Sequence, residues 1–154
     1  MKIHIGNYPK DPEKERKVSI RIDKWDVWNM DDTLAMIIAP MLKLLKEDKQ
    51  GIPGSFLHGE NNDENWKVAE EKWDEVLDKM IWSFEQYQID WEDQYWLVHP
   101  EFDFEKYPED EDKTLIPVRW KVEGKCDWEG RQKHWDRIQE GLELFGKHFS
   151  ELWS

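Results

Sequence analysis

The residues that could carry chemistry fall on two helical stripes and one short segment between a strand and a helix. Arginine and histidine can hold the oxygens of a phosphate or carboxylate group, tryptophan can stack on a planar ring, and aspartate can accept hydrogen bonds from a base or a ribose. Together these residue types predict one composite pocket for a nucleotide-like ligand. The predicted ligand-binding residues are Arg21, Asp23, Trp25, Asp26, Trp28, Asp78, Trp82, Glu85, His134, Arg137 and Gly141.

Each part of this set also has a plainer interpretation. Asp78, Trp82 and Glu85 are four and three residues apart, so they lie on one side of a helix, beside its core face. Acidic stripes of this kind are common on solvated helix surfaces. Gly130 and Gly141 stand inside a predicted helix, where a glycine costs about 1 kcal/mol relative to alanine; they indicate either tight helix packing or room for a ligand. The spacing leaves open whether the stripes face one another.

A metal site is the next alternative, because the chain offers several hard or borderline metal ligands. No HExxH motif, paired ExxH spacing or calcium-binding loop organises them. The candidate metal ligands are Asp23, Asp26, Asp74, Asp78, Glu85, His134 and His148.

Nucleophilic catalysis has less support in the sequence. There is no GxSxG elbow and no glycine-rich phosphate loop, and the single cysteine, Cys126, has a plainer interpretation as a partly buried structural residue. We therefore expect a protein that binds its ligand without turnover and uses no cofactor. A metal-dependent hydrolase built on Asp78, Glu85 and His134 is kept as a third alternative.

Composition limits the partners of the chain. Its 35 acidic and 22 basic residues give a net charge of −13, which opposes binding to a phosphate backbone, so no nucleic-acid binding is expected. No apolar run approaches the roughly 18 residues of a membrane span, and the N-terminus lacks the hydrophobic core of a signal peptide, so no membrane contact is expected. The lone cysteine fits a reducing cytoplasm. The acidic excess either confers solubility or offers a surface to a basic partner.

The longest element is an amphipathic helix at residues 66–87, which we expect to organise the fold. Apolar residues recur there at three- and four-residue steps, which predicts a helix of roughly 30 Å that is buried along one side. The stripe consists of Trp66, Ala69, Trp73, Val76, Leu77, Met80, Ile81, Phe84 and Tyr87. Asn62 or Asp63 is the expected N-cap.

The N-terminal part predicts two half-buried strands and a helix. Residues 2–6 and 17–22 alternate apolar with polar positions, so we expect an antiparallel pair. Asp31 or Asp32 is a suitable N-cap for the helix that follows, which runs to about Glu47 and should kink at Pro40. The predicted buried stripe of that helix is Leu34, Ile37, Ile38, Met41, Leu42 and Leu45.

The C-terminal part predicts two strands and a last helix. Residues 95–99 and 114–122 have the pattern of strands around an acidic loop at 101–112, and residues 127–153 form a helix that lies along the organising helix. Its predicted contact stripe is Trp128, Trp135, Ile138, Leu142, Phe145, Phe149 and Leu152. The fold class is therefore α+β, three main helices packed with a small antiparallel sheet, in a single domain over 1–154 with a variable excursion at 90–125.

Three blocks of the sequence resemble a family of small, acidic, tryptophan-rich proteins encoded by tailed bacteriophages. The blocks are RIDKWDVWNMDDTLAMIIAPMLKLLK, WDEVLDKMIWSFEQ and GLELFGKHFSELW. The resemblance implies an accessory protein made in the cytoplasm of an infected bacterial host. It supplies no known activity.

Two functions suit an accessory protein with this sequence. The tryptophan surplus, with Arg21 and Arg137, favours an anti-defence protein that sequesters a nucleotide-derived signalling molecule. The net charge and the acidic residues at 101–112 favour an inhibitor of a host defence protein, including one that mimics nucleic acid. A homo-oligomer with a shared pocket remains open, because symmetric dimers are common.

Overall fold

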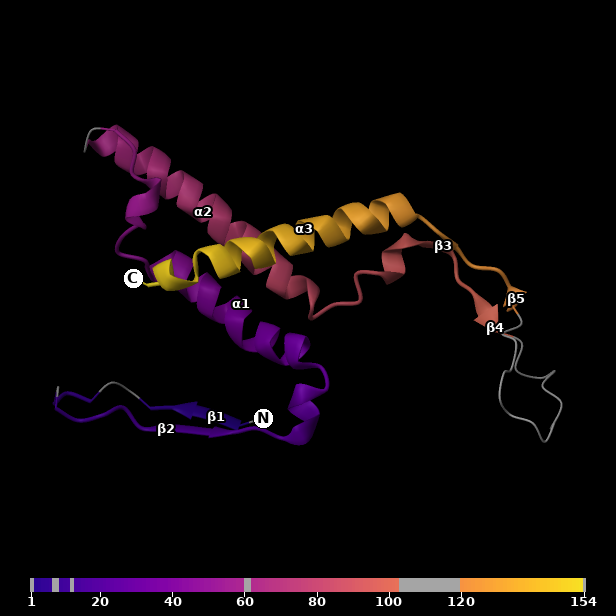
Figure 1. Cartoon of the computed structure of the whole chain (residues 1–154), viewed down its shortest axis with the longest axis horizontal. Helices are drawn as coiled ribbons and strands as arrows, with labels where there is room; N and C mark the ends of the chain where they lie inside the picture. Colours follow the sequence, from indigo (N-terminus) through magenta and orange to yellow (C-terminus); the bar gives the residue numbers. More distant parts are fainter. Residues whose placement is uncertain (1, 7–8, 12, 60–61, 103–119, 154) are drawn as a thin grey trace.

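The computed structural model describes residues 2–6, 9–11, 13–59, 62–102 and 120–153. Within these ranges the chain forms three α-helices and three two-stranded antiparallel sheets (Figure 1). The helices are α1 (Met30–Asp48), α2 (Asp63–Gln86) and α3 (Trp128–Lys147). The predicted α+β class is confirmed, although three separate strand pairs stand where one small sheet was predicted.

The strand pairs are short and separate. β1 (Lys2–Ile5) pairs with β2 (Val18–Arg21), β3 (Trp96–Val98) pairs with β6 (Lys125–Cys126), and β4 (Glu101–Phe102) pairs with β5 (Trp120–Val122). Short 3-10 turns adjoin the helices and strands: η1 (Lys24–Val27), η2 (Gly54–Phe56), η3 (Asp93–Tyr95) and η4 (Phe149–Glu151).

Helix α2 is the central element, as predicted, and packs against both α1 and α3. Its N-cap is Asn62, whose side chain accepts a hydrogen bond from the Asn65 amide at 2.9 Å. Trp66, predicted to be buried, is 40% exposed, because the first turns of α2 extend beyond the other two helices (Figure 1). The buried apolar residues of α2 are Ala69, Trp73, Leu77, Met80, Ile81 and Phe84.

The buried stripe of helix α1 was predicted in part: Leu42 is buried, and Ile38 and Leu45 are partly buried against the core, as predicted. Its buried residues are Ala35, Ala39 and Leu42, whereas Leu34 and Met41 are exposed. The alanines have small side chains, so they let α1 approach α2 closely, and this contact turns the larger residues outward. The predicted caps were also wrong, because α1 begins at Met30, one residue before Asp31.

The α1 helix is continuous from Met30 to Asp48 through Pro40. Pro40 is exposed, so the carbonyl group that loses its helical donor there can be hydrated. The proline is therefore accommodated without ending the helix.

The first strand pair is antiparallel as predicted, with Ile3 opposite Ile20 and Ile5 opposite Val18. The expectation that its strands are half-buried is wrong, since Val18 and Ile20 are each more than half exposed. The reason is that the pair stands apart from the helices and reaches them through η1, which packs against α1 (Figure 1).

The other predicted elements are confirmed in part. β3 lies within the predicted strand at 95–99, but its partner is β6, which the pattern did not predict. Of the predicted strand at 114–122, Trp120–Val122 form β5; residues 114–119 and most of the acidic segment at 101–112 lie outside the described residues. The last helix lies along α2 as predicted but ends at Lys147.

The contact stripe of α3 is narrower than predicted. Ile138 and Gly141 are buried in it, whereas Trp128, Trp135 and Phe149 are exposed. The first turns of α3 extend beyond the end of α2, so the tryptophans there have no α2 surface to pack against (Figure 1).

Gly141 is the point of closest approach between α2 and α3. A Cβ atom at this position would lie 2.5 Å from the Lys79 carbonyl oxygen and would overlap the Ser83 hydroxyl. Ser83 is fully buried there and donates its hydroxyl to the Lys79 carbonyl at 2.9 Å. The glycine therefore serves helix packing, which accounts for its presence inside a helix.

We predict that Gly141→Ala destabilises the fold. The added methyl group must push α3 away from α2, and overpacking of this kind costs about 1–3 kcal/mol. Urea denaturation followed by circular dichroism measures the change in the free energy of unfolding. Gly146→Ala is the matched control, because Gly146 lies in the same helix with nothing within 4 Å of its Cβ position, and alanine should stabilise it by up to about 1 kcal/mol. Equal effects at both positions would contradict the packing role.

Candidate ligand-binding site

Three of the predicted ligand-binding residues meet where α2 and α3 cross. The Arg137 guanidinium lies 3.7 Å from the centre of the Trp82 ring, and the His134 ring centre lies 5.0 Å from it. Gly141 lies one turn after Arg137 and two turns after His134 in α3. The close contact between α2 and α3 at Gly141 holds these residues together. Trp82 thus already has a cation over one face, which leaves less of its ring for a ligand.

His134 is the centre of a larger group, here called the His134 cluster: Trp82, Gln86, Trp91, Tyr95, His134 and Arg137. The Trp91 ring stacks on the His134 ring with centres 4.4 Å apart and planes 7° apart. Tyr95 Oη lies 3.0 Å from His134 Nδ1, and Gln86 Oε1 lies 3.0 Å from His134 Nε2. Both ring nitrogens are therefore occupied within the protein.

The hydrogen bonds of Gln86 assign the tautomer of His134. Gln86 Nε2 donates to the Trp82 carbonyl at 3.2 Å, so Gln86 Oε1 faces the imidazole and accepts a hydrogen bond from His134 Nε2. His134 Nδ1 then accepts from the Tyr95 hydroxyl. In this arrangement the imidazole is neutral and carries its proton on Nε2.

Burial and the neighbouring cation act in the same direction. Burial lowers the pKa of His134, and the positive charge of Arg137 lowers it further. His134 thus acts as a neutral support within the cluster, whose positive charge lies on Arg137.

A groove opens beside the His134 cluster, with Trp91 common to both. This aromatic groove has a volume of about 340 Å³, which is within the range of small-molecule sites. It is lined by Trp91, Glu92, Trp128, Arg131, Gln132 and Trp135. Trp128 is 62% exposed and Trp135 is 41% exposed, so both offer ring surface to solvent.

The segment between α2 and β3 forms one wall of the aromatic groove, and strand pairing fixes its position. The Asp127 amide donates to the Tyr95 carbonyl at 2.8 Å, and Trp96 pairs with Cys126 in the β3–β6 ladder. Asp127 also caps α3, accepting from the Gly130 amide at 3.0 Å. These bonds hold the Trp91–Tyr95 segment against the first turns of α3.

Arg131 is the cation of the aromatic groove. Its guanidinium lies 2.7 Å from Glu92 and 5.4 Å from the centre of the Trp128 ring. The hydrogen bond to Glu92 raises the pKa of Arg131, so the side chain stays charged. Because Glu92 is about half exposed, the pair lies at the solvent edge, where an incoming anion can compete for the guanidinium.

None of the residues of this groove was among the predicted ligand-binding residues. A signal was present in α3, since Trp128, Arg131 and Trp135 are three and four residues apart and share one side of the helix. The contribution of Trp91 and Glu92 depends on the β3–β6 pairing, which the pattern did not reveal.

The other predicted ligand-binding residues lie elsewhere. Asp78 pairs with Lys46 at 2.6 Å and Glu85 pairs with Lys43 at 2.6 Å, so both carboxylates bind lysines of α1. Gly141 accommodates Ser83. Neither carboxylate lines the aromatic groove.

The segment from β2 to η1 forms its own group. Asp26 accepts from the Asp23 amide at 2.7 Å, and Asp23 accepts from the Trp25 amide at 3.0 Å, a reciprocal capping box that begins η1. Trp25 and Trp28 contact each other with ring centres 6.0 Å apart and are exposed. Arg21 ends β2, and the aromatic groove includes none of these five residues. The structure therefore does not combine the predicted set in that groove.

His148, a candidate metal ligand, is buried in the core beside Trp73 and Phe56. Its Nδ1 lies 2.5 Å from Glu151 Oε2, and this hydrogen bond lowers the pKa of Glu151. Ser55 donates to the other oxygen of Glu151 at 2.9 Å. These contacts tie η2 and η4 to α2.

The described residues offer neither a metal-binding cluster nor a membrane-spanning helix. They contain no group of three or more His, Cys, Asp or Glu side chains arranged to hold a metal ion. No helix in the described ranges is both long and apolar enough to cross a membrane.

Comparison of the chain with protein-family models, with curated proteins and with solved structures gives no match. The bacteriophage resemblance therefore stays a prediction.

We predict that His134 titrates below its ordinary pKa of 6.5. The unfolded chain then binds a proton that the folded chain does not, so acidification below about pH 6.5 favours unfolding. An NMR titration of the His134 ring protons, assigned with a His134→Gln variant, measures the pKa directly. The variant should also lose less of its free energy of unfolding than the wild type as the pH falls toward about 5. A His134 pKa above 6.5 would contradict the neutral network.

Proposed function

We propose that this protein binds a planar, anionic, nucleotide-derived small molecule in the aromatic groove and holds it without turnover. The observation that carries the proposal is the grouping of Trp91, Trp128 and Trp135 around Arg131 in an open groove. Aromatic rings supply stacking surface to any base, and the guanidinium supplies a donor pair to phosphate oxygens.

The exposed rings indicate ligand binding more directly than the total number of tryptophans. Trp128 and Trp135 leave apolar ring surface in water on a helix whose other exposed residues are mostly polar. Stacking of a base on an aromatic side chain contributes about 1–3 kcal/mol. A ligand that covers both rings would therefore gain more than one such contribution.

The charges around the aromatic groove favour a small ligand over a polymer. The net charge of −13 repels an extended polyanion along its whole length. A small anion is affected mainly by charges within about one Debye length, roughly 8–10 Å, and there Arg131 is available to it. Gln132 donates one amide N–H to Asp136 at 2.7 Å, so its other N–H and its carbonyl oxygen are the groups that it can offer to the edge of a base.

The biological part of the proposal rests on the bacteriophage resemblance. An accessory protein that holds a nucleotide-derived signal in the cytoplasm of an infected host would lower the free concentration of that signal in proportion to the copies made. Tight binding without turnover suffices for such an anti-defence role.

We predict that Trp128→Ala weakens binding of the ligand by about 5- to 100-fold, corresponding to the loss of one stacking platform. The probes are adenosine and guanosine mononucleotides and their cyclic dinucleotides, titrated by isothermal calorimetry. Trp25→Ala is the matched control, because Trp25 is also exposed but lies in η1, and it should leave the affinity unchanged. Binding of none of the probes, or equal losses from the two variants, would contradict the proposal.

The arginine is tested in the same assay. Arg131→Gln should weaken phosphate-containing probes and leave the corresponding nucleosides unaffected, because it removes the cation but not the rings. Lys133→Gln changes the charge of the same helix by the same amount at a residue that pairs with Glu129, so it should have no effect. If the two variants behave alike, Arg131 makes no specific contact with the ligand.

A further inference from the structure

The β1–β2 hairpin presents one apolar face and one polar face. Alternate residues of a strand point to opposite faces, and Ile3 lies opposite Ile20 in the ladder, so Ile3, Val18 and Ile20 share one face. The alternation continues to Ile22 beyond the strand. The other face carries Lys2, His4, Ser19 and Arg21.

The apolar face of the hairpin is uncovered. The exposed fractions are 55% for Val18, 56% for Ile20 and 63% for Ile22, and Figure 1 shows the hairpin as a separate arm below α1. An isolated two-stranded hairpin is marginally stable in water, and an apolar face of this kind needs a packing partner. The apolar face of the hairpin therefore has no packing partner among the described residues.

A second uncovered apolar surface lies on the helices. This apolar groove has a volume of about 790 Å³ and runs between the second half of α1 and the end of α3 with η4. Met41 and Leu44, which line it, are both more than half exposed. Its lining is Ile38, Met41, Leu42, Leu44, Leu45, Asp48, Phe145, Phe149, Leu152 and Trp153.

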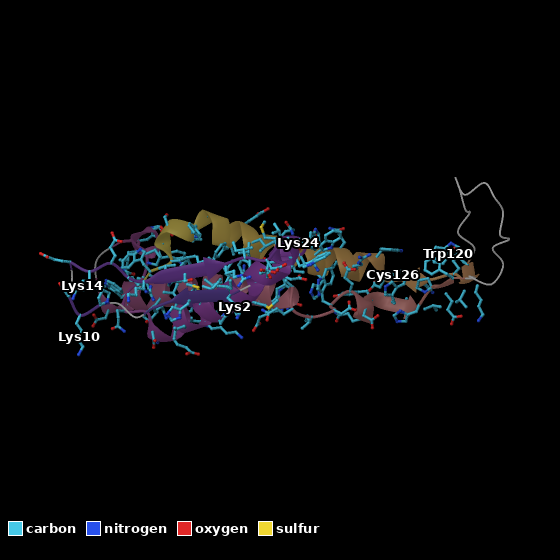
Figure 2. The ribbon with its side chains drawn as sticks, turned by 90° about the horizontal axis from the view of Figure 1, so that it is seen from below. Lys2, Lys10, Lys14, Lys24, Trp120 and Cys126 are labelled. Carbon is cyan, nitrogen blue, oxygen red and sulfur yellow. The ribbon has the colours of Figure 1, made fainter. Side chains whose placement is uncertain are left out.

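The charge of the chain is divided between the hairpin and the remaining residues. Residues 2–22 hold six Lys and Arg against three Asp and Glu, a net charge of +3; the rest of the chain holds 16 against 32, a net charge of −16. Figure 2 shows Lys2, Lys10 and Lys14 along the hairpin. Asp48 lines the apolar groove and forms no ion pair among the described residues. A basic arm and an acidic body attract each other, whereas two basic arms repel.

We propose that the occupant of the apolar groove is the β1–β2 hairpin of a second copy of this chain. Each copy inserts its hairpin into the groove of the other, so the two contacts are related by a two-fold axis. The apolar face meets the apolar groove, and the basic residues of the hairpin meet the acidic body around it.

Sedimentation equilibrium of the full chain tests the proposal with two pairs of variants. Ile20→Glu and Leu44→Glu should each raise the dimer dissociation constant by roughly 100-fold or more, because each buries an unpaired carboxylate in the contact. Ser19→Glu, on the other face of β2, and Met36→Glu, an exposed residue of α1 outside the apolar groove, are the matched controls and should remain dimeric.

Mixing the two disruptive variants separates this arrangement from the alternatives. The Ile20→Glu chain keeps an intact groove and the Leu44→Glu chain keeps an intact hairpin, so an equimolar mixture should form a heterodimer with one of the two contacts. A dimer that persists in Leu44→Glu would show hairpins pairing with each other and would overturn the proposal. A wild-type chain that is monomeric at every concentration, with its hairpin folded onto its own groove, would overturn it as well.

Discussion

The close contact of α2 with α3 at Gly141 is the constraint on which the rest of the structure depends. Ser83 fills the space where a side chain at Gly141 would lie, and this approach brings His134 and Arg137 of α3 against Trp82 and Gln86 of α2. His134 then holds Trp91 by stacking and Tyr95 by a hydrogen bond. A packing interaction in the core thus fixes the position of an aromatic wall at the surface.

Neutral and charged groups have separate roles in this region. In the His134 cluster, His134 is hydrogen-bonded to Tyr95 and Gln86, and the positive charge lies on Arg137, which covers Trp82. The aromatic groove beside it keeps exposed rings and a cation at the solvent edge. Elsewhere, the acidic side chains of α2 that face α1 bind lysines, so charge pairing on that side stabilises the helix bundle and offers little to a ligand.

The sequence predicted those elements in which large apolar residues determine the packing. The periodicity of α2 and the alternation of β1 and β2 were sufficient for their type and approximate bounds. The buried face of α1 was not predictable in this way, because Ala35 and Ala39 make the contact and the pattern gives weight to larger residues. None of the residues that line the aromatic groove was predicted to bind a ligand; the predicted Trp82, His134 and Arg137 lie in the His134 cluster beside it. The groove needs Trp91, whose position depends on the pairing of β3 with β6.

Binding in the aromatic groove is the central claim, and native mass spectrometry of the protein recovered from phage-infected bacteria tests it most directly. We expect a bound mass that heat releases as a nucleotide-derived molecule, one per aromatic groove, and that is missing from a Trp128→Ala variant recovered in the same way. Recovery of the bare chain from cells shown to contain such a signal, or of a complex with a host protein and no small molecule, would contradict the account.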